Sequence, residues 1–146
     1  MDFNGHRVIY VGFKLEPTSK YKLREMSHLD IPHGDHVTLA YGNAVTPAHM
    51  AVLGRHLELR AQEWWSDGKA VALTVAWPGW VCPCCNARAH VTLSTKEGVC
   101  PVHSNELFRD TRNRGRRVDM PIYGHVEAFL DNGTWTCHGR IPGLLD

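Results

Sequence analysis

The sequence predicts an α+β fold with two similar lobes, on three observations. The chain has 146 residues, which is near the commonest size for one domain, so we expect a single unit over 1–146. Strand-type and helix-type segments alternate along it. The tetrapeptide His-Val-Thr-Leu occurs twice, at 36–39 and at 90–93, once in each half.

The expected strands are segments rich in β-branched and aromatic residues that end at turn residues. They cover 7–15, 36–41, 69–77, 87–95, 122–130 and 134–137. Helices are expected near 19–29, over 47–62 and, as a short one, over 104–108. The basic segment 109–117 is expected to be a loop, and 139–146 a loose tail.

The expected helix over 47–62 rests on a start signal and on one apolar face. Thr46 has the chemistry of a helix cap, and Pro47 suits the first turn. The apolar face would consist of Met50, Leu53 and Leu57.

Composition limits the classes of function. The formal charge of +1 gives no global attraction to nucleic acid or to an anionic membrane, so any phosphate binding must be local. No apolar run approaches the roughly 20 residues of a membrane helix, and the first residues are too polar for a signal peptide. We therefore expect a cytoplasmic protein without a membrane partner.

The repeated tetrapeptide has a definite geometry on a strand. Side chains alternate between the two faces, so His36 and Thr38 share one face while Val37 and Leu39 anchor the other. The tetrapeptide at 90–93 repeats this arrangement with His90 and Thr92. If the lobes face each other, two imidazoles and two hydroxyls meet.

Two histidines and two threonines suit the cleavage of a phosphodiester. One neutral histidine would take a proton from the attacking hydroxyl or water, and the other, protonated, would give one to the leaving oxygen. The threonine hydroxyls would donate hydrogen bonds to the non-bridging phosphoryl oxygens. This chemistry needs no metal or other cofactor.

The doubled pattern of His, apolar, Thr, apolar resembles the 2H phosphoesterase superfamily. The resemblance implies two pseudo-symmetric antiparallel sheets flanked by helices around a central cleft, with His36, Thr38, His90 and Thr92 as catalytic residues. Relatives include RNA 2′,3′-cyclic phosphodiesterases, the cyclic phosphodiesterase domain of tRNA ligases, and phage anti-CBASS enzymes that destroy cyclic oligonucleotide signals. A nucleotide or oligonucleotide substrate is therefore expected, without a stable protein partner.

Further residues are candidates for substrate binding. Tyr10, Tyr41 and Tyr123 lie on or beside expected strands and could stack on a nucleobase, although core packing is the alternative for aromatic residues there. Arg116, in the basic segment, could pair with a substrate phosphate, and a solvated loop is its alternative.

A zinc-ribbon-like binding module is the rival interpretation. Cys82 and Cys85, followed by Cys100 and His103, give the spacing of a structural zinc site. If zinc binds there, His90 and Thr92 are ordinary members of the segment between the ligands, and His36-Val37-Thr38 stays unexplained. The alternative to zinc binding is that the cysteines are free, buried and packed as small apolar groups. One His-x-Thr triplet alone would indicate only a half-exposed strand, but an identical tetrapeptide in each half favours a functional pair.

Overall fold

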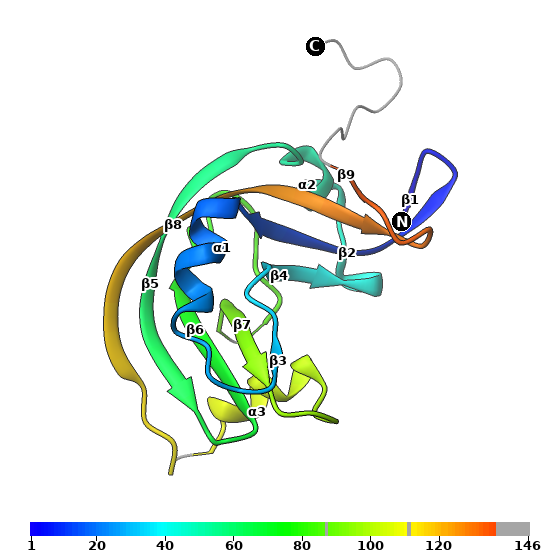
Figure 1. Cartoon of the computed structure of the whole chain (residues 1–146). Helices are drawn as coiled ribbons and strands as arrows, with labels where there is room; N and C mark the ends of the chain where they lie inside the picture. The colour runs from blue at the N-terminus through cyan, green and yellow to red at the C-terminus, as the bar shows by residue number, and fades with distance from the viewer. Residues whose placement is uncertain (87, 111, 137–146) are drawn as a thin grey trace.

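The computed structural model describes residues 1–86, 88–110 and 112–136, and in this part the fold is α+β with a dominant antiparallel sheet (Figure 1). The strands are β1 (Asp2–Phe3), β2 (His6–Leu15), β3 (Ile31–Pro32), β4 (His36–Tyr41), β5 (His56–Ser66), β6 (Ala70–Ala76), β7 (His90–Thr95), β8 (Arg116–Leu130) and β9 (Trp135–Thr136). The helices are α1 (Pro17–Arg24), α2 (Pro47–Ala51) and α3 (Ser104–Leu107), with 3₁₀ turns η1 (Gly42–Ala44) and η2 (Pro101–His103).

The strands form one nine-stranded sheet rather than the two separate sheets expected. Its order is β1-β2-β4-β7-β6-β5-β8-β9, with β3 paired to β7. An additional pairing of β2 with β8 closes six of the strands, β2, β4, β7, β6, β5 and β8, into a ring. Every pairing in the sheet is antiparallel.

The long strand β8 is the reason why one sheet forms. Its 15 residues, about 50 Å when extended, are enough to pair with two neighbours in succession. The first part of β8 pairs with β5, and the second part pairs with β2. Gly124 lies at the change of partner, opposite both Leu15 and Leu57. In Figure 1, β5 and β8 curve side by side around one flank of the molecule.

The opposite side of the ring is a short seam between β4 and β7. A single aligned pair, Val37 with Val91, joins them, and both side chains are fully buried. Leu39 and Leu93 are buried beside them, which confirms the alternation expected of the two tetrapeptides. Leu23 of α1 reaches the same core. The core thus holds the apolar half of each motif and leaves its polar half on the other face.

The predicted helix over 47–62 is wrong beyond its first residues. The capping box of Thr46 and His49 forms as the start signal indicates, but α2 ends at Ala51. Gly54 then adopts a left-handed backbone with φ of 84°, and β5 begins at His56. Over 56–61 outward residues alternate with the inward Leu57, Leu59 and Ala61, so period-two burial against β8 and β6 outweighs the local helical spacing.

Other boundaries also move. The helix expected near 19–29 is Pro17–Arg24, and the strand expected over 87–95 begins at His90, while residue 87 lies outside the described residues. In the basic segment, residues 109–110 and 112–115 lie outside the helices and strands, β8 begins at Arg116, and residue 111 lies outside the described residues. The strand expected over 134–137 is Trp135–Thr136, and residue 137 and the expected tail at 139–146 also lie outside the described residues. No helix in the described residues has the length and apolarity needed to cross a bilayer.

Gly124→Ala should lower the free energy of unfolding by roughly 1–3 kcal/mol or more, because a Cβ there would overlap the Lys14 carbonyl at the point where β8 changes partner. Urea unfolding measures the effect. Gly79→Ala is the control, since nothing lies within 4 Å of a Cβ at that position. Equal stability of the two variants would contradict the close strand crossing at Gly124.

Candidate active site

A cavity of about 510 Å³ opens on the polar face of the β4–β7 seam and brings the predicted catalytic residues together. His36, Thr38, His90 and Thr92 all line it. The remaining lining residues are Tyr10, His33, Asp35, Tyr41, Asn86, Cys100, Pro101, Val102 and Asn105. Two tetrapeptides that are 54 positions apart in the chain therefore contribute to one concave site.

The register of the seam arranges the four side chains. Continued by one residue on each side of the Val37–Val91 pair, it places His36 near Thr92 and Thr38 near His90. The two histidines then occupy diagonal positions, which are typically about 7–8 Å apart.

The seam is short because neighbouring loops, rather than the other motif strand, form hydrogen bonds with the remaining backbone carbonyls of β4 and β7. The Cys85 backbone N–H donates to the Leu39 carbonyl at 2.7 Å, and the Asn86 side-chain amide donates to the Thr38 carbonyl at 3.3 Å. At the other end the Gly34 N–H donates to the Thr92 carbonyl at 2.8 Å. These loops form walls of the cavity.

His90 is held in one tautomer. Its Nδ1 lies 2.8 Å from the Arg88 carbonyl oxygen, which can only accept a hydrogen bond, so Nδ1 carries the hydrogen. Burial lowers the pKa of this histidine below its ordinary value of 6.5, against the Arg88 hydrogen bond that raises it, and nearby His36 lowers it further. Within the described residues Nε2 makes no hydrogen bond, so a neutral ring presents a free lone pair at this atom.

His36 has a different environment, with a carboxylate on one side and a hydroxyl on the other. Its Nδ1 lies 3.6 Å from Asp35 Oδ2, an ion-pair distance slightly longer than a hydrogen bond, and its Nε2 lies 3.1 Å from Thr38 Oγ1. The interaction with His36, and then that with Lys20 at 2.7 Å, holds the pKa of Asp35 well below its ordinary value although burial opposes this. Asp35 is therefore anionic, and its carboxylate lies beside the imidazole of His36.

The two threonines differ in what they contact. Thr38 Oγ1 is bonded to the imidazole of its own motif. Thr92 Oγ1 lies 2.8 Å from the hydroxyl of the fully buried Ser104 and donates at 3.5 Å to the Pro101 carbonyl. Ser104 thus fixes Thr92, whose hydroxyl hydrogen can turn from Pro101 to a ligand in the cavity.

Aromatic packing fixes the ring of His36 from behind. Tyr10 stacks on it at 5.3 Å between centroids, and Trp135 meets it edge-on at 5.4 Å. Gly12 lies under this packing: a Cβ there would make ordinary contacts with the His36 ring at 3.4 Å and with Trp135 at 3.6 Å, and a tight one with the Val37 carbonyl oxygen at 3.1 Å. Trp135 belongs to β9, and the sequence around it gives no sign that it lies beside His36.

Of the predicted substrate-binding residues, the structure brings two to the cavity. Tyr10 and Tyr41 line it, with their rings 6.0 Å apart, and burial, followed by the charge of Asp35, raises the pKa of Tyr10 to about 12. Tyr123 and Arg116 are not among its lining residues. The Tyr123 hydroxyl donates to Glu58, and the Arg116 guanidinium lies over Trp64 at 5.7 Å.

The sequence missed several cavity residues. His33, whose pKa burial lowers, bonds Thr95 through its Nε2 at 3.0 Å. Asp35 directly precedes the first motif, so adjacency to His36 was the available signal for it. Asn86 and Asn105 come from loops, and only the fold brings them to the cavity.

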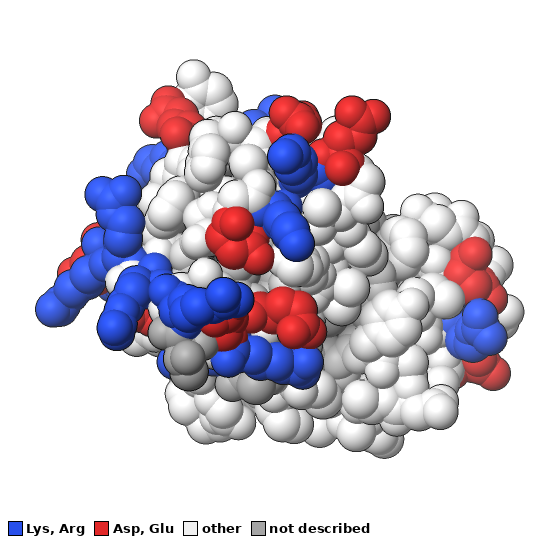
Figure 2. Space-filling view, turned by 90° about the horizontal axis from the view of Figure 1, so that it is seen from below, with Lys and Arg blue, Asp and Glu red and all other residues white. Residues whose placement is uncertain are grey.

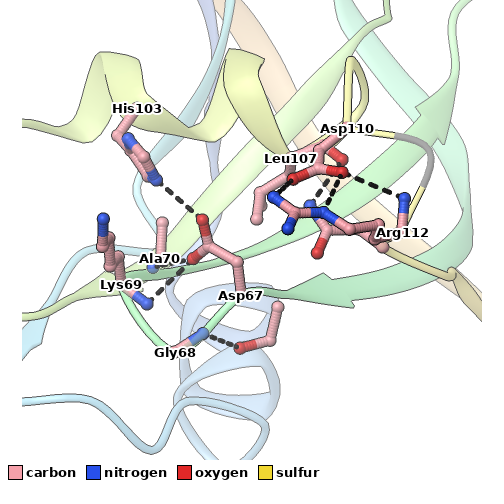
Figure 3. Close-up of polar contacts among 10 residues, drawn as sticks. Asp67, Gly68, Lys69, Ala70, His103, Leu107, Asp110 and Arg112 are labelled. Carbon is pink, nitrogen blue, oxygen red and sulfur yellow. Dashed lines mark hydrogen bonds and ion pairs between the residues drawn. The ribbon is translucent and has the colours of Figure 1, made fainter.

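The side chains of the proposed zinc site are not arranged as ligands. His103 Nε2 lies 2.8 Å from Asp67 Oδ2, and Asp67 also accepts from the backbone N–H groups of Lys69 and Ala70 (Figure 3). Cys82 is buried, which raises its pKa to about 11 and favours the thiol over the thiolate that binds metal. No group of three or more His, Cys, Asp or Glu within 1–86, 88–110 and 112–136 is placed to hold a metal ion.

Acidic partners neutralise part of the basic segment that precedes β8. Arg112 makes two bonds to the Asp110 carboxylate, at 3.0 and 2.8 Å, and Arg109 pairs with Glu106 at 3.0 Å (Figure 3 shows the former). Viewed from below, Lys and Arg side chains gather on one side, with acidic side chains among them (Figure 2). This surface is therefore of mixed charge.

The sequence matches no protein-family model and no curated protein.

His90 should titrate below the ordinary histidine pKa, which NMR of the ring Cε1–H signals can measure. Because the folded state binds this proton more weakly than the unfolded chain does, the neutral ring stabilises the fold above about pH 6.5, and this contribution is lost as the pH falls through the lowered pKa. His90→Asn should reduce this pH dependence of the unfolding free energy. A His90 pKa at or above 6.5 would contradict the described environment.

Proposed function

We propose that the protein is a metal-independent phosphodiesterase of the 2H type that hydrolyses a nucleotide phosphodiester. The observation that carries the proposal is the convergence of His36, Thr38, His90 and Thr92 on one cavity from the two sides of the β4–β7 seam.

In this mechanism His90 is the general base. Its Nδ1–H stays bonded to the Arg88 carbonyl while Nε2 takes a proton from the attacking water. The water oxygen then forms a bond to phosphorus. Burial serves the role, because it keeps the imidazole neutral and ready to accept a proton at neutral pH.

His36 is the general acid. In its protonated form the ring, which has the anionic Asp35 beside it, gives the Nε2 proton to the leaving oxygen as the phosphorus–oxygen bond breaks. After one turnover His90 holds the extra proton and His36 lacks one, and exchange with water restores both. Asp35 is a positioning residue, since it acts through His36.

The threonines stabilise the charge that develops on the phosphoryl group. When the Nε2–H of His36 turns to the leaving oxygen, the Thr38 hydroxyl can donate its own hydrogen to a non-bridging oxygen. Ser104 donates to Thr92 Oγ1, and Thr92 turns its hydrogen from Pro101 to the other non-bridging oxygen. Both hydroxyls lie beside the seam before the substrate arrives, Thr38 held by His36 and Thr92 by Ser104.

The substrate class follows from the resemblance and from the cavity. Tyr10 and Tyr41 line the cavity beside the reactive centre, where the nucleoside attached to the phosphate would lie. A cyclic nucleotide, a cyclic oligonucleotide signal or an RNA 2′,3′-cyclic phosphate fits this chemistry. Action on a cyclic oligonucleotide signal would place the enzyme in the cytoplasm of a host cell as a viral counter to immunity.

The two histidines should respond differently to the leaving group. On a nucleoside 2′,3′-cyclic phosphate, His36→Ala and His90→Ala should each lower kcat/KM by about 10²–10⁴. On a nucleotide p-nitrophenyl ester, whose leaving group needs no proton, His36→Ala should lose much less and His90→Ala should lose as much as before. Both sets of rates are measured in EDTA with purified variants.

Circular dichroism melting of the two variants controls for folding, and Asn105→Ala changes a cavity residue that has no role in proton transfer. A loss that is the same for both leaving groups in His36→Ala would refute the assignment of the acid. Unchanged rates in both variants, or dependence on a metal, would refute the proposed function itself.

A further inference from the structure

A second cavity, of about 620 Å³, lies beside the first on the same face of the sheet. It extends from the segment that precedes β7 across β6 to β5. Its polar and aromatic lining consists of Gln62, Glu63, Thr74, Trp77, Asn86 and Arg88. None of the four predicted catalytic residues lines it.

Strand register connects the second cavity to the reactive centre. Thr74 of β6 lies directly opposite His90, and Glu63 of β5 lies directly opposite Thr74. Residues in such direct pairs share a face and have Cβ atoms about 4.5–5.5 Å apart, so the second cavity begins one strand away from the general base. Asn86 lines both cavities, and its bond to the Thr38 carbonyl fixes it between them.

Thr74 has a buried hydroxyl without a partner. The residue is 4% exposed, and its Oγ1 has no hydrogen bond among the described residues. A buried hydroxyl left in this state costs free energy, which a ligand group would recover once the Thr74 side chain turns its hydroxyl toward the cavity. The strand itself does not require this hydroxyl, because valine has the same branched shape and β6 carries valine at 71 and 75.

The rest of the lining offers both hydrogen-bond donors and hydrogen-bond acceptors, and other side chains hold part of it in place. Glu63 Oε1 accepts from Arg88 at 3.3 Å and from the Trp65 indole at 3.4 Å, which holds the carboxylate in place. Gln62 is exposed at the rim and supplies a carboxamide, which can both donate and accept. Mixed hydrogen-bonding groups beside an aromatic wall, here Trp77, are what recognition of a nucleobase edge requires.

The geometry points to the second cavity as a nucleobase subsite, in which the base of the substrate binds Thr74 and Gln62 while its phosphate lies between the histidines. This inference rests on the proposed function for the position of the phosphate. It adds that the substrate is a nucleotide held by its base in this cavity, and that Thr74 and Gln62 determine affinity rather than rate.

Kinetics with and without a base test the inference. Thr74→Val and Gln62→Ala should each raise KM for nucleoside 2′,3′-cyclic phosphates about tenfold, as the loss of one hydrogen bond to a ligand implies, with kcat changed less than twofold. Hydrolysis of bis(p-nitrophenyl) phosphate, which has no base, should be unaffected. Thr18→Val, at an exposed position of α1, is the matched control. Unchanged KM values in both cavity variants would overturn the inference.

Binding separates this inference from the proposed function. In the His36→Ala/His90→Ala background, calorimetry should show that a nucleoside monophosphate binds more tightly than inorganic phosphate and that Thr74→Val removes most of the difference. This result would support the subsite even if the wild-type protein hydrolysed no phosphodiester, which would refute the proposed function alone. Equal binding of the nucleotide and inorganic phosphate, or no effect of Thr74→Val, would overturn the subsite even in an active enzyme. Melting temperatures confirm that Thr74→Val folds, as expected for the removal of a hydroxyl without a partner.

Discussion

The burial of Val37 against Val91 is the contact on which the site depends. These two residues form the single aligned pair between β4 and β7, and both are excluded from solvent. Because strand side chains alternate, fixing the valines in the core turns His36, Thr38, His90 and Thr92 to the opposite face at the same seam. A displacement of either strand by one residue would exchange the buried and polar sets, so the hydrophobic core enforces the geometry of the site.

The environments of the two histidines follow from where the chain enters each motif strand. Before β7, Arg88 presents a carbonyl to His90, and the surrounding core excludes water from the ring. Before β4, Asp35 presents a carboxylate to His36, which is half-buried and stacked on Tyr10. Identical tetrapeptides therefore acquire different surroundings, with His90 buried against a backbone carbonyl and His36 beside a carboxylate.

The sequence predicts the motif strands and their alternation because these depend on period-two patterning, and the structure confirms them at β4 and β7. It fails beyond Ala51, because the helical spacing of Met50, Leu53 and Leu57 continues past the end of α2 into β5, whose partner strand β8 is distant in the chain. The single closed sheet depends on one long strand, β8, which local signals divided between a loop and a shorter strand. Tyr10 and Tyr41 could be selected from the sequence because they are aromatic residues on or beside expected strands. Asn86 and Trp135 reach the site only through tertiary contacts.

The most direct test of the central claim is whether one phosphorus-like centre engages both imidazoles. With ¹⁵N-labelled histidine, NMR can follow the ring nitrogens while a nucleoside–vanadate complex, which imitates the five-coordinate transition state, is titrated into the protein. We expect the Nε2 signals of His36 and His90 to shift together and to saturate at one complex per chain. A shift confined to one of the two rings, or saturation of the two rings at different concentrations, would contradict a shared reactive centre.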